Sequence, residues 1–376
     1  PAGAPVRRYD VVAISARQAL GGLGLVYNER AGAFAGQRGP LHDPTAAMYV
    51  LASDLVDGRL APGRQPEPLA LRAAAGECIE VTLENRLPAN WAAQVAAPQN
   101  HGFSALPLLI DRFNMNQLRP SQEVGLHAQL VASDTTRSDG ANVGLNTTIR
   151  NGARSTSQTA APGQRVTYRW YAGRLVPQGN RLVAVPVEFG AVNLMPADRI
   201  RQSGKGLIGA LVVLPRGASW TEDAGRRTAA TVTFTDPEGN ARRFRDFVLM
   251  FQDDLNLRAG GRAVCPPGAA EALGEDEEGE PVSVTARGCL GAEDPQDSGN
   301  VALNYRAEPL WMRLGYAPGE NHDITGKVDF AAATSNRTGP GTPRTPIYTA
   351  RVGEELRFRL LQPGGHGRSA VFALQG

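Results

Sequence analysis

A strand pattern that occurs three times constrains the fold of this chain more than any other feature of its sequence. Each copy begins with a glycine and a glutamate or glutamine, and apolar side chains follow three, five and seven positions after the glycine. The copies span residues 76–83, 163–170 and 353–360. Successive side chains of a strand point to opposite faces, so each copy predicts a strand with one buried, apolar face. The repetition favours antiparallel β-sandwiches, and we expect an all-β chain.

The composition agrees with many short strands and excludes several functions. The chain has 43 glycines and 27 prolines, which predict many turns. A formal net charge of +2 provides no field to hold nucleic acid or an anionic membrane. No apolar run is long enough to span a bilayer. The motifs of serine hydrolases, phosphate-binding loops, dinucleotide-binding folds and zinc sites are missing from the sequence, so these classes have no support.

The length of 376 residues predicts two domains. The polar stretch 216–228 has the character of a linker. We therefore expect one domain with long loops over 1–220 and a second over 228–376. The glycine-, proline- and acid-rich segment 259–300 is predicted to be a solvent-exposed insertion rather than a cation site, because runs of acidic residues are usually solvated.

The second predicted domain has too few strands. A sandwich domain needs roughly seven, and the sequence from Thr228 onward offers four or five. An unpaired apolar edge is then expected near Gly376, and folded proteins normally cover such edges. We expect further protein, on this chain or on another, to cover it.

The three cysteines are too few for a disulfide scaffold. Cys265 and Cys289 flank the acidic insertion, whereas Cys78 lies in an alternating apolar segment. We predict a disulfide between Cys265 and Cys289 and a buried free thiol at Cys78. The alternative is three reduced cysteines, because sequence alone does not fix pairing.

Several segments resemble multicopper oxidases. The phrase G-E-C-I-E-V-T-L-E-N-R-L-P at 76–88 is similar to the first-domain strand of that family. Further resemblances cover the strand that closes the first domain, the opening of the second cupredoxin domain and a later strand pair, at residues 206–213, 245–257, 304–309, 353–361 and 372–376. The resemblance implies tandem cupredoxin-like Greek-key β-sandwiches, the second incomplete at its C-terminal end.

A narrower resemblance is to the large bacterial manganese(II)-oxidising branch, through residues 126–131, 137–144 and 364–368. It implies one-electron oxidation of a substrate, with Mn(II) favoured, coupled to reduction of dioxygen to water. It also implies a secreted, periplasmic or cell-surface location, with copper bound beyond Gly376. The alternative is a non-catalytic cupredoxin module that serves structure or binding in a surface, filament or matrix.

The departures from this family concern its copper ligands. The family binds copper through a cysteine flanked by histidines and through His-x-His pairs, because residues i and i+2 of a strand face one metal cluster. This chain has five histidines, and no two of them are two positions apart. Asn90-Trp91-Ala92 stands where laccases have His-Trp-His, and 193–195 reads Asn-Leu-Met in place of another pair. We expect no catalytic residue, no copper and no complete metal site within 1–376.

Single histidines are the remaining metal-ligand candidates. These are His101, His127 and His366. A lone histidine is more often a hydrogen-bonded structural residue than a ligand. Met195 is similarly expected to be a core residue rather than an axial ligand.

Overall fold

The computed structural model describes residues 1, 3–29, 40–97, 100, 119–141, 149–150, 153–154, 158–199, 201–253, 255, 257–259, 262–264, 274–275, 281–282, 301–309, 347–364 and 372. Nearly all of their regular structure is β, which confirms the predicted all-β class. The helices in these ranges are α1 (Ala16–Leu20), α2 (Trp91–Val95) and the single 3₁₀ turn η1 (Ala52–Asp54). None of them has the length or apolar character needed to cross a membrane.

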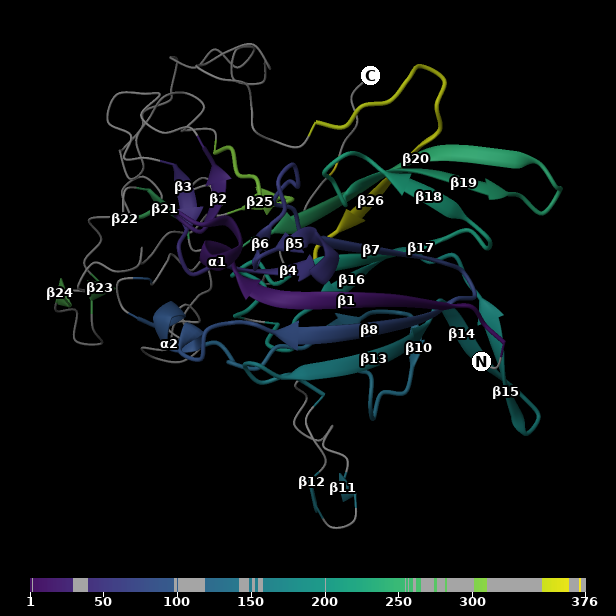
Figure 1. The fold of residues 1–376 in the computed structure, drawn as a ribbon, viewed down its shortest axis with the longest axis horizontal. Coiled ribbons are helices and arrows are strands. Elements are labelled where there is room, and N and C mark those ends of the chain that lie inside the picture. Colours follow the sequence, from purple (N-terminus) through teal and green to yellow (C-terminus); the bar gives the residue numbers. More distant parts are fainter. Residues whose placement is uncertain are drawn as a thin grey trace.

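Three sheets form the body of the molecule (Figure 1). The first sheet has the order β10 (Ala132–Ser133), β13 (Arg165–Tyr171), β8 (Cys78–Asn85), β1 (Val6–Ser15) and β4 (Ala47–Leu51). The central sheet has the order β7 (Leu69–Ala74), β17 (Gly209–Leu214), β16 (Gly190–Met195) and β9 (His127–Ala128). The third sheet has the order β18 (Ser219–Glu222), β19 (Ala229–Thr235), β20 (Ala241–Gln252) and β25 (Ala302–Leu303), with β26 (Leu356–Leu361) also paired to β20.

Smaller sheets surround this body. One has the order β2 (Leu25–Asn28), β3 (Leu41–Asp43), β21 (Arg258–Ala259) and β22 (Arg262–Ala263). The others are two-stranded: β5 (Leu55–Val56) with β6 (Arg59–Leu60), β11 (Ile149–Arg150) with β12 (Ala153–Arg154), β14 (Gly173–Gln178) with β15 (Arg181–Pro186), and β23 (Gly274–Glu275) with β24 (Pro281–Val282). The β14–β15 hairpin projects away from the sheets (Figure 1).

The pairing is mixed, whereas the sequence predicted antiparallel sheets. Each main sheet contains one parallel pair, namely β1 with β8, β7 with β17 and β20 with β26. Parallel neighbours need a long connection, and in each case long stretches of chain separate the two strands. The local alternation of side chains is the same in both arrangements, so it did not distinguish them.

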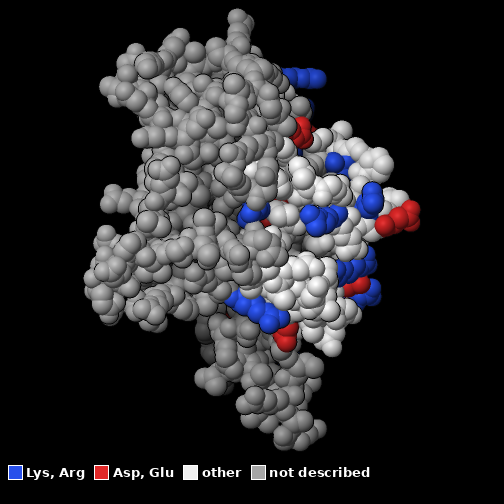
Figure 2. All heavy atoms as spheres, turned by 90° about the vertical axis from the view of Figure 1, so that its left-hand side faces the viewer, with Lys and Arg blue, Asp and Glu red and all other residues white. Residues whose placement is uncertain are grey.

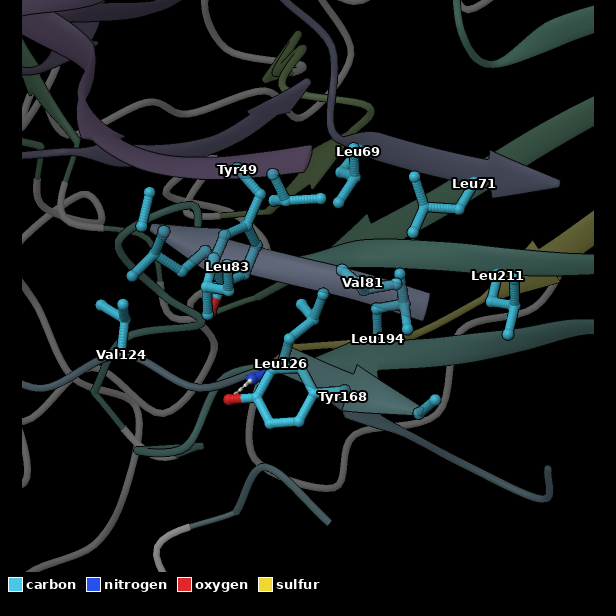
Figure 3. Close-up of a cluster of buried hydrophobic side chains, with 14 of the residues drawn as sticks. Tyr49, Leu69, Leu71, Val81, Leu83, Val124, Leu126, Tyr168, Leu194 and Leu211 are labelled. Atoms are coloured by element: carbon cyan, nitrogen blue, oxygen red, sulfur yellow. Dashed lines mark hydrogen bonds between the residues drawn. The ribbon is translucent and has the colours of Figure 1, made fainter. Parts of the chain in front are cut away.

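The central sheet is buried on both faces. Alternate β17 side chains, such as Leu211 and Val213, join a core shared with Val81 and Leu83 of β8 (Figure 3). The side chains between them, such as Val212, join a second core shared with the third sheet. Strands on both sides of the predicted linker therefore contribute to one core. The domain limits of 1–220 and 228–376 stay a prediction.

The first core also holds a buried tyrosine hydrogen bond. The hydroxyl of Tyr168 accepts from the backbone N–H of Leu126 at 3.3 Å (Figure 3) and donates to the carbonyl of Gln158 at 2.6 Å. Burial raises the pKa of Tyr168 far above its ordinary value. The hydroxyl is thus satisfied in its neutral form.

Two of the three template strands have the predicted orientation. In β8, Ile79, Val81 and Leu83 are fully buried, and the corresponding face of β13 is largely buried too. In β26 the prediction is wrong. Leu356 and Leu360 are 42% and 44% exposed, and the arginines between the apolar residues bond to acidic groups, Arg357 to the exposed Glu188 and Arg359 to the buried Asp246.

Cys78 is free, as predicted, but it is only partly buried. It opens β8 on the same face as Glu80, whereas the next residue, Ile79, points into the core. Cys265 and Cys289, and most of the predicted insertion between them, lie outside the described residues. Their pairing stays a prediction.

Charges on the surface are mixed. Figure 2 shows basic side chains in separate groups, several with an acidic side chain beside them, on the described part of one face. Many are cross-strand pairs, such as Glu80 with Arg169 at 2.9 Å and Glu84 with Arg165 at 2.8 Å. This arrangement agrees with the small net charge.

Candidate functional site

The β9–β16 pair holds Asn193 and Met195, which the sequence resemblance matches to a His-x-His pair of multicopper oxidases. Asn193 and Met195 lie on one face of β16, because they are two positions apart. Met195 is directly opposite His127 in the register, and the Nδ2 of Asn193 donates to Oε1 of Gln129 at 3.0 Å. The structure therefore brings together an imidazole, a thioether and two carboxamides.

His127 is anchored by a backbone contact. Its Nδ1 lies 2.7 Å from the carbonyl oxygen of Asp139 and 3.4 Å from a carboxylate oxygen of the same residue. A carbonyl oxygen only accepts, so Nδ1 carries the hydrogen and donates it. In the neutral ring this leaves the lone pair on Nε2. His127 can offer one ring nitrogen to a metal, and Met195 is its neighbour across the β9–β16 pair.

Residues 90–92, which the sequence resemblance matches to His-Trp-His of laccases, make structural contacts. Trp91 is the first residue of α2, is fully buried, and donates from its indole nitrogen to the carbonyl of Thr45 at 2.9 Å. The side chain of Asn90 accepts from Gln94 at 3.0 Å. The backbone N–H of Ala92 donates to the side chain of Gln122 at 2.9 Å. This segment closes the end of the first core and provides no imidazole.

These residues do not fit the copper centres of the resembled family. A type 1 centre needs a thiolate between imidazoles, but the cross-strand neighbours of Cys78 are Val6 and Tyr171. His42 lies in a different sheet from His127 and uses its Nδ1 on the carbonyl of Pro40 at 3.0 Å. Among the residues that the structure describes, no group of three or more His, Cys, Asp or Glu could hold a metal. The candidates His101 and His366 lie outside those residues.

A buried ionic cluster joins the central sheet to the third sheet. Arg72 of β7 is fully buried and donates from Nε and Nη2 to one oxygen of Asp246 in β20, at 3.2 and 3.1 Å. The other oxygen of Asp246 accepts from Arg359 of β26 at 2.7 Å. Arg72 also donates to the carbonyl of Arg227 at 2.7 Å. One carboxylate thus holds an arginine from each of two sheets.

The cluster continues into the segment before β19. Arg227 donates to both oxygens of Asp54 at 2.9 and 2.6 Å and contacts Glu222. Glu67 accepts from Arg226 at 2.8 Å and from the hydroxyl of Thr228 at 2.9 Å. Charge-assisted hydrogen bonds of this kind fix geometry strongly when they are shielded from water. The third sheet is therefore fixed in orientation on the central sheet.

A small cavity lies beside this cluster. It has a volume of about 20 Å³ and is lined by apolar residues of β4 together with Asp54, Arg64, Glu67 and Arg227. A space of this size holds one water molecule rather than an organic substrate. It is part of the ionic contact and not a substrate pocket.

Sequence reasoning missed the ionic cluster. The signal was an arginine within the apolar run Leu69–Ala74 and an aspartate within the alternating run of β20. A charge at such a position is costly unless it is paired. The partner could not be identified, since Arg72 and Asp246 are 174 positions apart.

In comparisons by sequence, no protein-family profile and no curated protein matches the chain. Among solved structures, it is similar to one described as a multicopper oxidase, with 14% identity and a TM-score of 0.28, over 72% of this chain and 58% of that one. It is also similar to a mutant of the laccase from B.aclada, with 14% identity and a TM-score of 0.27, over 67% of this chain and 26% of that one. The chain thus spans less than two thirds of the length of either protein.

Proposed function

We propose that residues 1–376 are the copper-free cupredoxin-type scaffold of a multicopper oxidase. The main support for the proposal is that residues without imidazoles occupy the positions matched by sequence to copper ligands of the resembled family. Asn90 caps α2 at the surface, Ala92 packs in the first core, and Asn193 and Met195 lie in the β9–β16 pair. Here the strand positions that resemble the family are kept, and the imidazoles that would bind copper are replaced.

The placement of the resembling segments supports this proposal. Residues 76–88 contain β8, 206–213 contain most of β17, and 245–257 contain most of β20. These three strands lie in the three main sheets, where they contribute to the two cores. The resemblance therefore lies in the structural framework of the chain.

Copper loading tests the proposal. The purified chain is incubated with Cu(II), desalted, and assayed for copper content and visible absorption. We expect no intense thiolate-to-copper band, since Cys78 has no cross-strand histidine. Such a band, lost in Cys78→Ser but retained in the matched control His42→Asn, would contradict the proposal.

We further propose that the intact oxidase takes Mn(II) as its reductant and acts outside the cytoplasm. The resemblance of residues 126–131 and 137–144 to the manganese-oxidising branch supports this. The chain by itself is expected to leave Mn(II) unoxidised in air. Longer chains that add copper-bearing domains one at a time are expected to gain Mn(II) oxidation, and failure of every copper-loaded chain would contradict the choice of Mn(II).

The remaining proposal concerns the partner of β26. Its outward face exposes Leu356 and Leu360, and the ring of Phe372 lies 5.6 Å from that of Phe358. Exposed apolar strands are normally covered, so we propose that further cupredoxin structure packs here, from the same protein or another chain. The substitution Leu360→Glu is expected to weaken that association in a pull-down with the remaining domains. Unchanged binding would contradict it.

The same face favours the alternative of a non-catalytic binding module. That role would need neither copper nor Mn(II). Association of the β26 face with a partner, together with no Mn(II) oxidation in any copper-loaded form, would favour the module over the oxidase.

A further inference from the structure

Lys205 and Asp43 form a fully buried pair. Their side chains are each 2% exposed, and Nζ of Lys205 contacts Oδ2 of Asp43. Yet neither atom has a hydrogen-bond partner of acceptable geometry. The amine touches the carboxyl group without the orientation of an ordinary charge-assisted hydrogen bond.

The choice of lysine at this position is unusual for this chain. The sequence contains two lysines, Lys205 and Lys327, among 39 basic residues. The ionic cluster at the third sheet uses arginine throughout. Arginine holds ion pairs well but stays protonated, whereas a buried lysine can lose its proton and act as a nucleophile.

The carboxyl group of Asp43 is polarised from one side. Its Oδ1 accepts from the backbone N–H of Thr45 at 2.8 Å and from the Thr45 hydroxyl at 2.9 Å. Both donors point at one oxygen, while the other oxygen faces the amine. Two donors on a carbonyl-type oxygen stabilise negative charge that develops there during attack on the carbon.

The backbones that carry the pair are also fixed. The carbonyl of Lys205 accepts from Ala47 N–H at 2.8 Å, and the carbonyl of Thr45 accepts from the indole of Trp91 at 2.9 Å. Gly24 packs so closely that an added Cβ would lie 2.6 Å from the carbonyl oxygen of Asp43. The two groups are therefore held in contact rather than brought together by chance motion.

We propose that Lys205 and Asp43 condense to an intramolecular amide that cross-links the last residue of β3 to the segment before β17. The amine Nζ attacks Cγ of Asp43, the Nζ–Cγ bond forms and the Cγ–Oδ2 bond breaks. Oδ2 leaves as water with two protons, which come from the neutral amine and the neutral carboxylic acid. No oxidation, reduction or further reactant is involved.

Burial lowers the pKa of Lys205, and the neighbouring Asp43 opposes this only in part. The charges of Arg201 and Arg258 also act on the pair: both lower the pKa of Lys205, and Arg258 attracts the carboxylate of Asp43. Proton transfer from ammonium to carboxylate gives an uncharged pair, which a low-dielectric interior tolerates better than two ions. The buried Tyr27 lies close to the pair, and burial, followed by the charge of Asp43, raises its pKa well above normal. The Tyr27 hydroxyl therefore stays neutral and does not compete with the Lys205 amine as a nucleophile.

The mass of the intact chain tests the proposal under denaturing conditions. We expect the purified protein to be lighter than its sequence by one water molecule, and Lys205→Arg to have the full sequence mass. A lysine-specific protease adds a second readout, because amidation blocks cleavage at Lys205. The expected result is one cut, at Lys327, in the parent chain.

Two results would overturn the proposal. A parent chain of full mass that is cut at both lysines has an ordinary buried ion pair. A chain that lacks one water but is still cut at Lys205 has lost the water elsewhere. Lys327→Arg is the matched control and is expected to keep the lower mass. Both readouts are made on unfolded protein, so a variant that folds poorly still gives an answer.

Discussion

Strands β8 and β26 have the same sequence template but opposite orientations. In β8 the apolar residues point into the first core, and the polar residues between them form cross-strand contacts at the surface, such as Thr82 with Thr167 at 3.2 Å. In β26 the apolar Leu356 and Leu360 are exposed, and Arg359 points inward to Asp246. Alternation predicts a strand, but the partner available on each side decides which face is buried.

Toward the interior, β26 contacts a buried carboxylate through Arg359 and the second core through Leu361. Asp246 is fully buried and already accepts from Arg72, so its remaining oxygen attracts a second arginine. Burying Leu356 and Leu360 instead would leave that oxygen unpaired, which costs more than exposing two apolar side chains. The comparison predicts that the position of β26 is stabilised mainly by its ionic contact with Asp246, and that of β8 mainly by apolar packing.

The largest expected effect comes from removing the charge below β26. Asp246→Ala leaves Arg72 and Arg359 without their shared acceptor, and it should lower the free energy of unfolding by about 3–5 kcal/mol. Chemical denaturation of the variant and parent measures this. Asp236→Ala removes an exposed turn aspartate and serves as control. Equal losses of unfolding free energy in Asp246→Ala and Asp236→Ala would contradict a stabilising role for the charge below β26.

Leucine truncation compares the two strands directly. Leu83→Ala in β8 opens a cavity in the first core and should cost about 2–5 kcal/mol. The matched Leu360→Ala in β26 removes a side chain that is already half in water and should cost about 0.5 kcal/mol. Denaturation midpoints of the two variants give the difference. Similar costs would mean that the β26 face is covered in solution.

The partly buried Tyr9 of β1, which packs against the first core, makes stability depend on alkaline pH. Burial raises the pKa of Tyr9 to about 12 from an ordinary value of 10.0, and its hydroxyl donates to the carbonyl of Arg72 in β7. Between these two pH values the unfolded chain releases the proton and the folded chain keeps it. Stability that is fully present below pH 10 should therefore fall as the pH rises toward 12.

Tyr9→Phe isolates this contribution from that of other buried tyrosines. The variant should lose less stability than the parent over the same pH range, as measured by denaturation at several pH values. An identical slope in both proteins would show that Tyr9 ionises equally in the folded and unfolded states.

The smallest effect is expected on the exposed face of β8. Glu80 pairs with Arg8 and Arg169 across two neighbouring strands, at 3.3 and 2.9 Å. Glu80→Gln should lower stability by about 0.2–1 kcal/mol, and the loss should shrink in high salt. A loss as large as that of Asp246→Ala would contradict the view that β8 depends on packing.

The sequence predicted what depends on local pattern. It identified β8 and β13 with their buried faces, and it identified the absence of histidine pairs at 90–92 and 193–195. It did not predict the parallel pairing, the inverted β26 or the partner of Arg72. Each of these is set by a contact between distant segments, for which alternation within one strand carries no information.

The pairing of β7 with β17 also bears on how the chain folds as it is made. Leu69 pairs with Gly209 in the central sheet, on which both cores depend. The ribosome adds roughly 5–20 residues per second, so β7 waits on the order of ten seconds for its partner. Until β17 emerges, both faces of the nascent sheet are exposed to water, and non-local pairing of this kind is slow. During that interval the apolar strands of the nascent chain are open to association with other chains.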